Sequence, residues 1–423
     1  MSFDIALSGI QAINDSLDVT SHNIANAGTY GYKSSRANFS TLVAGNQQTG
    51  VKVGSITQSI GLAGGILNTG NTKDASINGR GFFVTRASDN SLQYTRVGIF
   101  NASEDGYLTD ASGRKVQGRS LTPPSTTLGA EGDLKIPTGQ IPAVVSQKAN
   151  YVGNLSADWP VTTGYDSSTI TPDTPPDPST YNMAKTTTMY DTLGGKHSLT
   201  QYFSASAQGE VTVHYTLDGN PLDDALAYTL KFNVTTGQMT DPDPLTAKGV
   251  VSLGDLSAID TSNSTLWPKF TSGAKMGTAV TIDYTGTSYF AGEATTATNN
   301  ADGYASGTYQ GIDLASDGSV IAKYSNGEKQ AIGKIVLATF ADEGALTQIS
   351  DTSWVESNAS GPANTDIAGV GVNGSLSVAT LEQSNVDITS ELVGLMTSQR
   401  NYQANSKVIQ TESTMLQSLM QAI

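Results

Sequence analysis

The sequence predicts a mixed, mainly β protein whose two ends form coiled-coil-like helices. Three observations support this fold class. Apolar residues recur at steps of three and four near both ends. The middle consists of alternating apolar and polar runs closed by Gly, Asn or Asp, and the 44 glycines of the chain provide for many turns. We therefore expect helical ends around a strand-rich middle.

The N-terminal helix is expected to run from Phe3 to the stop signals at Asn26, Gly28 and Gly31. Its apolar spacing has the heptad period of a coiled-coil seam, not that of a broad amphipathic face. Asn14 and Ser21 are polar members of the seam. Its apolar members are Phe3, Leu7, Ile10, Leu17 and Ile24.

The C-terminal helix is expected to begin after the capping residues between Ser384 and Asp387. It repeats the same spacing, with Gln399, Ser406 and Ser413 as polar members. Its apolar members are Ile388, Leu392, Leu395, Tyr402, Ile409, Leu416, Met420 and Ile423.

In both helices one seam position is always apolar, and the other mixes Leu and Met with Asn, Gln and Ser. A seam of this kind makes a weak isolated coiled coil, but it suits a helix that must select one register among several neighbours. Partner helices are therefore implied. The pattern is also compatible with the two ends pairing with each other inside one chain, and it leaves both interpretations open.

Strand and turn signals dominate the middle of the chain. Alternating runs at 81–86 and 92–100 and a turn at Asp105-Gly106 predict antiparallel strands. A hairpin turn at Asn326-Gly327 joins two further runs. Residues 160–180 are rich in proline and predict a surface loop or a domain junction, after which a second compact β block follows.

Composition excludes several classes of function. The formal net charge of −15 argues against a nucleic-acid partner, which needs a clustered cationic face. The absence of cysteine removes disulfide and thiolate chemistry. The first residues lack the basic and apolar regions of a secretory signal, and the sequence has no apolar run of the roughly 18 residues that a membrane span needs.

A search for catalytic or ligand-binding motifs predicts none. His22, His197 and His214 have no metal-ligand spacing and no Ser-His-Asp arrangement around them. The Gly-rich stretches at 61–65 and 78–81 lack the dinucleotide fingerprint and the phosphate-loop lysine. We expect no catalytic residue, no metal and no cofactor.

Three separated stretches resemble motifs of the rod-hook family of bacterial flagellar axial proteins. They are LDVTSHNIANAGTYGYKSSRANF (17–39), INGRGFFVTR (77–86) with YTRVGIFNASEDGYLTDASGRKVQG (94–118), and LEQSNVDITSELVGLMTSQRNYQANSKVIQT (381–411). Within this family, hook proteins carry an outer β domain inserted into an inner one, and residues 146–284 look like that insertion.

The resemblance implies a nested architecture in which sequence order corresponds to radius in a tube. The expected parts are a terminal helical domain from residues 1–28 and 380–423, a connecting segment at 29–70, an inner β domain from two chain pieces at 71–145 and 285–365, and an inserted outer β domain at 146–284.

The resemblance also implies a structural role and no enzymatic activity. The chain would be a subunit of the extracellular flagellar hook, a flexible curved hollow tube that acts as a universal joint, transmits torque from rod to filament and passes exported subunits. Subunit contacts would involve the seam residues named above. Expected partners are identical subunits, the distal rod protein, the hook-associated junction protein, the hook cap and the flagellar type III export apparatus, with export lacking a cleaved signal peptide. The alternatives are a distal rod protein and a secreted β-rich adhesin or carbohydrate-binding module.

The C-terminal helix carries few charges outside its seam. From Glu391 onward the charged residues are Glu391, Arg400, Lys407 and Glu412, and Asn405 is among the neutral polar residues between them. A helix face exposed to water would normally carry Lys and Glu. We expect this neutral face either to line the tube's channel or to pack against neighbouring helices. The candidate channel residues are Gln403, Gln410 and Gln421.

Overall fold

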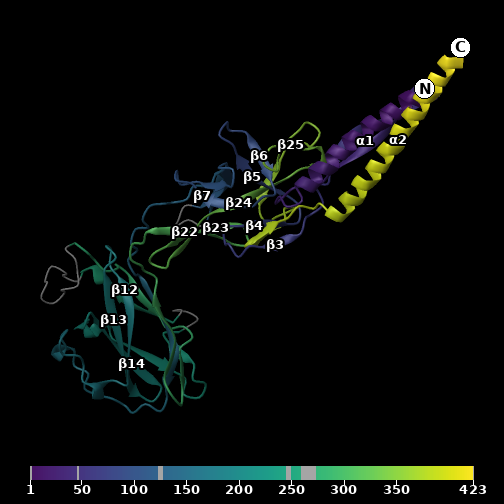
Figure 1. Ribbon diagram of the computed structural model, residues 1–423. Coiled ribbons are helices and arrows are strands. Elements are labelled where there is room, and N and C mark those ends of the chain that lie inside the picture. Colours follow the sequence, from purple (N-terminus) through teal and green to yellow (C-terminus); the bar gives the residue numbers. More distant parts are fainter. Residues whose placement is uncertain (1, 45–46, 122–126, 244–248, 259–272, 423) are drawn as a thin grey trace. The chain divides into compact units, whose positions relative to one another are not determined.

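The computed structural model describes residues 2–44, 47–121, 127–243, 249–258 and 273–422, so the predicted seam residue Ile423 lies outside the described part (Figure 1). The chain divides into two compact units. Unit 1 comprises Met1–Thr138, Gln310–Lys323 and Lys329–Ile423, and unit 2 comprises Gly139–Tyr309 and Tyr324–Glu328. None of the helices in the described ranges is long and apolar enough to cross a membrane.

Unit 1 contains both long helices and most of its strands belong to one sheet. Its elements are α1 (Ser2–Ala25), β1 (Ser35–Ala44), β2 (Gln47–Gln58), β3 (Ile66–Asn68), β4 (Ala75–Asn78), β5 (Phe82–Arg86), β6 (Leu92–Thr95), β7 (Phe100–Ala102), β8 (Leu108–Asp110), β9 (Lys115–Leu121), β10 (Leu128–Asp133), β22 (Tyr309–Leu314), β23 (Ser319–Tyr324), β24 (Lys329–Thr339), η5 (Glu343–Ala345), β25 (Thr347–Ile349), β26 (Ser353–Val355), β27 (Asn364–Ile367), β28 (Ser375–Val378), β29 (Thr380–Glu382) and α2 (Ile388–Ala422).

Unit 2 is built of strands and short 3-10 turns. Its elements are β11 (Lys148–Ser156), η1 (Ser167–Thr169), η2 (Pro178–Thr180), β12 (Met183–Tyr190), β13 (Lys196–Ala207), β14 (Glu210–Leu217), β15 (Asn220–Pro221), η3 (Asp224–Leu226), β16 (Tyr228–Phe232), β17 (Met239–Asp241), β18 (Val250–Gly254), η4 (Leu256–Ala258), β19 (Val280–Asp283), β20 (Ser288–Phe290) and β21 (Thr295–Ala301).

Both terminal helices form as the sequence predicts. α1 ends at Ala25, beyond which the Asn26 amide still donates to His22 O at 3.1 Å, and Gly31 turns the chain with a φ of +68°. α2 begins after Asp387, whose carboxylate accepts from Thr389 N at 3.0 Å and caps the first turn. The two helices pack side by side within one chain (Figure 1).

The large sheet of unit 1 has the strand order β22-β23-β24-β9-β5-β6-β26-β25. One of its faces carries an aromatic core in which Phe82 and Trp354 meet edge to face with centroids 5.6 Å apart, and Tyr94 meets Phe340 at 4.8 Å. The turns predicted at Asp105-Gly106 and Asn326-Gly327 are present, with positive φ angles at both glycines.

The run at 92–100 is not one strand, which corrects the sequence expectation. It separates into β6 and β7 because the chain leaves the sheet at Gly98 and approaches the backbone of Ala75. Ala75 N donates to Gly98 O at 2.8 Å, and a Cβ on Gly98 would lie 1.8 Å from Ala75 O. Only glycine permits this approach.

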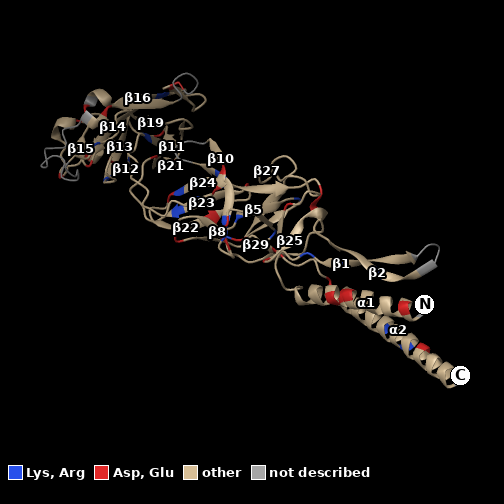
Figure 2. Ribbon diagram, turned by 90° about the horizontal axis from the view of Figure 1, so that it is seen from above, with Lys and Arg blue, Asp and Glu red and all other residues tan. Residues whose placement is uncertain are grey.

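The connecting segment contains a long hairpin, β1 and β2, that the sequence analysis missed. Its antiparallel register runs from Ser35 opposite Gln58 to Ala44 opposite Gln47. The hairpin lies along α1 (Figure 2), where Val51 N donates to Ser8 Oγ at 3.2 Å. Unit 1 therefore surrounds α1 with α2 and this hairpin.

Unit 2 is two packed sheets around one core. One sheet has the order β12-β13-β14-β16-β17, and the other has β18-β19-β11-β20 with β21 paired to β11. The proline-rich residues 160–180 lie within this unit, where Tyr165 stacks on His214 of β14 at 3.8 Å. Unit 2 contains the whole of the predicted outer domain at 146–284, and the predicted domain boundaries stay a prediction.

Candidate assembly surface and the junction behind it

The face that α1 buries consists mainly of small residues. Ala6, Gly9, Ala12 and Ile13 are buried on this side of the helix, followed by Val19, Thr20 and Asn23. A Cβ on Gly9 would lie 3.0 Å from Asn405 Nδ2 of α2, so the missing side chain lets the two helices approach closely. The small-residue face is what holds α1 to the rest of its own chain.

The predicted seam of α1 lies on another side of the helix. Phe3 and Leu7 are each 41% exposed, and Ile10, Leu17 and Ile24 are half-buried. At 3.6 residues per turn, Phe3 and Leu7 point away from the stripe through Ala6 and Gly9, whereas Ile24, five full turns after Ala6, comes into line with it. The exposed members Phe3 and Leu7 are therefore not needed to join α1 to α2 within the chain.

On α2 the predicted seam divides into two groups. Leu395 and Ile409 are half-buried and stand four residues after Glu391 and Asn405, two of the α2 residues that contact α1. The other members are exposed, each by 40% or more of its surface: Ile388, Leu392, Tyr402, Leu416 and Met420.

The last turns of α2 extend beyond α1. Asn23 bonds Glu391 at 2.8 Å and Gly9 lies against Asn405, which defines an antiparallel register for the pair. Both helices rise by the same distance per residue, so extending this register places the start of α1 opposite Glu412. α2 itself continues to Ala422 (Figure 1). The overhang exposes Met415, Leu416, Leu419 and Met420 by 56% to 75% of their surface.

A second exposed apolar stripe on α2 was missed by the sequence analysis. Val393, Val408, Met415 and Leu419 are all at least 44% exposed, and they lie on a side of the helix away from the predicted seam. Their separations of 15, 7 and 4 residues keep them on one face. This spacing can be read from the sequence, but its separations are less regular than those of the heptad seam.

The candidate channel residues share one side of α2. Gln403, Gln410 and Gln421 are all exposed, and separations of seven and eleven residues bring them into line. Asn405, which belonged to the same neutral set in the sequence, instead packs against Gly9 of α1. Figure 2 shows how few charged residues α2 carries.

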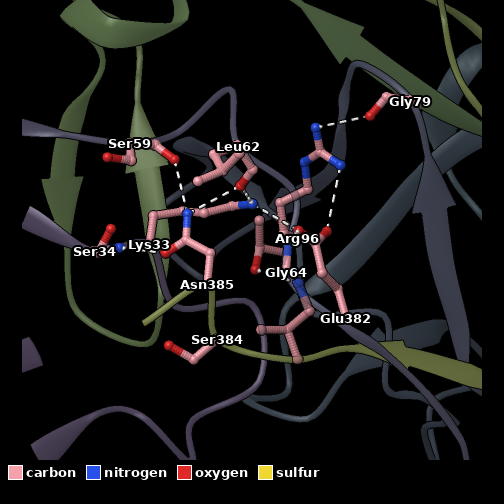
Figure 3. Close-up of polar contacts among 12 residues, drawn as sticks. Lys33, Ser34, Ser59, Leu62, Gly64, Gly79, Arg96, Glu382, Ser384 and Asn385 are labelled. Carbon is pink, nitrogen blue, oxygen red and sulfur yellow. Dashed lines mark hydrogen bonds and ion pairs between the residues drawn. The ribbon is translucent and has the colours of Figure 1, made fainter. Parts of the chain in front are cut away.

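Behind the helices a buried ionic cluster joins the two ends of the chain to the β part of unit 1 (Figure 3). Lys33 Nζ contacts Glu382 Oε1 at 2.6 Å, and Arg96 Nη1 lies 3.4 Å from Glu382 Oε2. Their side chains are 4% exposed or less. Arg96 also donates to Gly79 O at 3.0 Å and stands over the ring of Phe82.

Backbone groups complete the cluster. Leu62 O accepts from Lys33 Nζ at 2.7 Å and from Asn385 Nδ2 at 3.0 Å. Glu382 Oε1 also accepts from Gly64 N at 3.1 Å, and Asn385 Oδ1 accepts from Ser34 N at 2.7 Å (Figure 3). The segments before β1, after β2 and before α2 are thereby fixed to one another.

The electrostatics of this cluster are those of a buried ion pair. Burial lowers the pKa of Lys33, and the carboxylate of Glu382 opposes that shift. Burial also lowers the pKa of Arg96, again against the attraction of Glu382. Two cations thus depend on one carboxylate, so loss of either partner would leave a charge buried with incomplete compensation.

Asn23 makes a second connection between the elements. Its amide donates to Ser35 O at 2.7 Å and to Glu391 Oε1 at 2.8 Å, and its Oδ1 accepts from Ser35 N and from Tyr32 OH. One buried side chain therefore ties α1 to the start of β1 and to the first turn of α2. Burial also raises the pKa of Tyr32.

The contacts of these residues join segments of the chain to one another. Among the described residues no group of three His, Asp or Glu side chains is placed to hold a metal ion. His22 lies near the end of α1, His214 stacks on Tyr165, and His197 is buried between two aspartates. The sequence analysis did not predict the Lys33–Glu382 contact, because the two residues are 349 positions apart.

Three family descriptions match this chain. "Flagellar hook protein FlgE/F/G D1 domain" matches residues 76–155, "Flagellar basal body protein FlaE D2 domain" matches residues 154–304, and "Flagellar basal body rod FlgEFG protein C-terminal" matches residues 379–422. The matches cover both the β-rich middle and the C-terminal helix.

Relatives match over nearly the whole chain. Flagellar hook protein FlgE of Salmonella typhimurium is 33% identical, covering 99% of each chain, and that of Escherichia coli is 32% identical with the same coverage. The crystal structure of Helicobacter pylori flagellar hook protein FlgE2 covers 73% of this chain and 98% of its own, with a TM-score of 0.49 at 13% identity. The family assignment depends on the sequence matches.

Proposed function

Because this chain belongs to the flagellar hook protein family, we propose that its exposed helical surface is where identical subunits join into the hollow tube of the hook. As a member of that family the chain is a structural subunit of the extracellular bacterial flagellum. The proposed contact surface comprises Phe3, Leu7, Ile10, Leu17, Ile24, Ile388, Leu392, Leu395, Tyr402, Ile409, Leu416 and Met420.

The observation that supports this surface is that most of its members stay outside the small-residue face through which α1 packs in its own chain, while Leu395 and Ile409 stand beside that contact. Ala6, Gly9 and Ile13 are buried, while Phe3, Leu7 and Leu416 stay exposed. Burying one large apolar side chain is worth roughly 1.5–3 kcal/mol, so each added subunit would gain from covering this seam. A head-to-tail contact that does not close on itself generates a helical polymer.

The overhang of α2 supports the proposal that a second copy makes its first contact there. Its exposed Leu416 and Met420 continue the seam beyond the end of α1. An apolar surface of this kind on a helix end is an assembly site in an oligomer and a liability in a monomer. A helix from a neighbouring subunit, with the same seam spacing, is its matching partner.

The neutral side of α2 supports a channel-lining role for Gln403, Gln410 and Gln421. These side chains are exposed and face away from the contact between Asn405 and Gly9. Neutral amides would hold neither apolar nor charged segments of a passing unfolded chain. Replacement of Gln410 and Gln421 by Glu is expected to slow filament growth while hooks still assemble. Filament growth at the normal rate would show that this side does not line the channel.

Membership of the family supports the finer features that we propose for this function. They are the absence of enzymatic activity, a flexible curved tube that transmits torque, and export by the flagellar type III apparatus without a cleaved signal peptide. The proposed partners are identical subunits, the distal rod protein, the hook-associated junction protein and the hook cap. The relatives that match this chain over nearly its full length are flagellar hook proteins, which favours the hook over the rod and adhesin alternatives.

The seam is tested by a charge placed on the overhang. Leu416→Asp is expected to prevent polymerisation, because a carboxylate enclosed in an apolar contact loses its hydration without compensation. Leu416 lies beyond α1, so the monomer should keep its fold. Ser418→Asp, on another side of the same turn, is the matched control. Negative-stain microscopy and sedimentation of the purified proteins provide the measurement. Normal tubes from Leu416→Asp would rule out this surface.

A further inference from the structure

A buried histidine in unit 2 lies between two carboxylates. His197, at the start of β13, has its Nδ1 atom 2.6 Å from Asp218 Oδ2 and its Nε2 atom 3.1 Å from Asp191 Oδ2. The imidazole and the Asp191 side chain are fully buried, and the Asp218 side chain is 2% exposed. No motif in the sequence marks this arrangement.

The hydrogen-bond geometry at His197 favours the protonated imidazole. A neutral imidazole has one N–H donor and one acceptor nitrogen, whereas both nitrogens of the imidazolium donate. Here each nitrogen faces a carboxylate oxygen within hydrogen-bond distance. Loss of the ring proton would leave one nitrogen lone pair against a buried carboxylate, which is repulsive in surroundings of low polarity.

The two aspartates hold different turns. Asp191 follows β12, and its Oδ1 accepts from Leu193 N at 2.8 Å and from Gly195 N at 2.7 Å. Asp218 follows β14, and its Oδ1 accepts from Ser198 N at 2.9 Å. His197 therefore fastens the β12–β13 turn to the β14–β15 turn through one cation.

Two lysines belong to segments that adjoin this cluster. Lys196 precedes His197 in β13, and the backbone carbonyl of Lys275 accepts from Thr192 N. Burial disfavours the charged ring, but hydrogen bonds and attraction from Asp218 and Asp191 outweigh it and raise the pKa of His197.

The sign of the resulting pH dependence follows from the raised pKa. The stabilisation is fully present below about pH 6.5, the ordinary value for histidine, and is lost as the pH rises through the folded-state value. The affected range therefore lies above about pH 6.5.

We propose that Asp191, His197 and Asp218 form a pH-sensitive staple, which fastens two turns of unit 2 while the imidazole is protonated and releases them as rising pH removes that proton. The staple acts inside unit 2 and does not depend on the proposed subunit contacts. On an extracellular protein it would make this unit respond to the acidity of the surroundings.

Two measurements on the full chain test the staple. The first is an NMR titration of histidine Cε1 resonances, which the three histidines of the chain make assignable through His22→Gln and His214→Gln. The His197 resonance is expected to titrate above the ordinary value for histidine, about 6.5. The second is hydrogen exchange of residues 191–198 and 217–220, corrected for the intrinsic rate. Each unit of raised pKa corresponds to a tenfold change in opening, so the fall in protection across the titration should match the shift of the His197 pKa that NMR measures.

The controls separate the staple from general alkaline loosening. His197→Gln should remove the pH dependence of protection in both turns, and His214→Gln, on the neighbouring strand, should keep it. A His197 resonance that titrates at or below the ordinary value would overturn the proposal. Protection of the turns that does not change while His197 titrates would do so too. The titration of the unaltered chain decides the question even where the His197→Gln variant fails to fold.

Discussion

Lys33 and Glu382 lie 349 positions apart in the sequence, yet they form a buried ion pair at 2.6 Å. Arg96 reaches the same carboxylate from the β part of unit 1. Sequence patterns predict periodic features, such as the seam, because each repeat supports the next. A single long-range pair has no period, and for this reason the cluster at the centre of the junction could not be predicted.

The buried cluster predicts a large cost for removing its lysine. Lys33→Met should lower the free energy of unfolding of unit 1 by about 3–5 kcal/mol, because the Glu382 carboxylate stays buried with reduced compensation. Lys115→Met is the matched control, since Lys115 pairs with Asp133 at 3.6 Å with a side chain 41% exposed. That change should cost less than about 1 kcal/mol. Denaturant titration of both variants measures the difference, and equal costs would show that the cluster does not stabilise the junction.

The two helices show which part of an element can be predicted from sequence. Their bounds, their caps and the Asn26 stop agree with the sequence analysis, because capping and periodicity are local properties. The face each helix buries was not predicted. The sequence analysis predicted helix contacts along the apolar seam, whereas α1 packs within its chain through Ala6, Gly9 and Ile13. A stripe of small residues carries little hydrophobic signal, although close helix packing depends on it.

Gly9 provides a test of that packing. Gly9→Leu should destabilise the helix pair by about 1–3 kcal/mol, because the added side chain meets Asn405 where a Cβ already lies 3.0 Å from Nδ2. Gly394→Leu in α2 is the matched control, since no heavy atom lies within 4 Å of a Cβ built there. That change should stabilise α2 by improving its helix propensity. Thermal unfolding followed by circular dichroism reports both effects. A more stable Gly9→Leu variant would contradict the proposed packing face.

At the scale of the whole molecule, the chain separates the surfaces that hold it together from those it leaves exposed. Small residues and the ionic cluster hold unit 1, and the predicted seam stays largely exposed. The mainly β fold with helical ends was predicted correctly, because alternating runs and heptads extend over many residues. The hairpin of β1 and β2 was missed, since its strands carry exposed polar residues at both faces and no clean alternation.

The central claim is that the exposed seam becomes buried between subunits when the hook assembles. The chain contains no cysteine, so a single introduced thiol reports on one position. Leu416→Cys and Leu7→Cys place it on the seam, and Gly28→Cys, where no heavy atom lies within 4 Å of a Cβ, provides the comparison. The decisive measurement is the rate of maleimide labelling in the monomer and in the assembled tube. The account predicts that both seam thiols react quickly in the monomer and at least tenfold more slowly in the tube, because a buried thiol exchanges with water only through rare opening. Equal labelling of the seam thiols before and after assembly would contradict it.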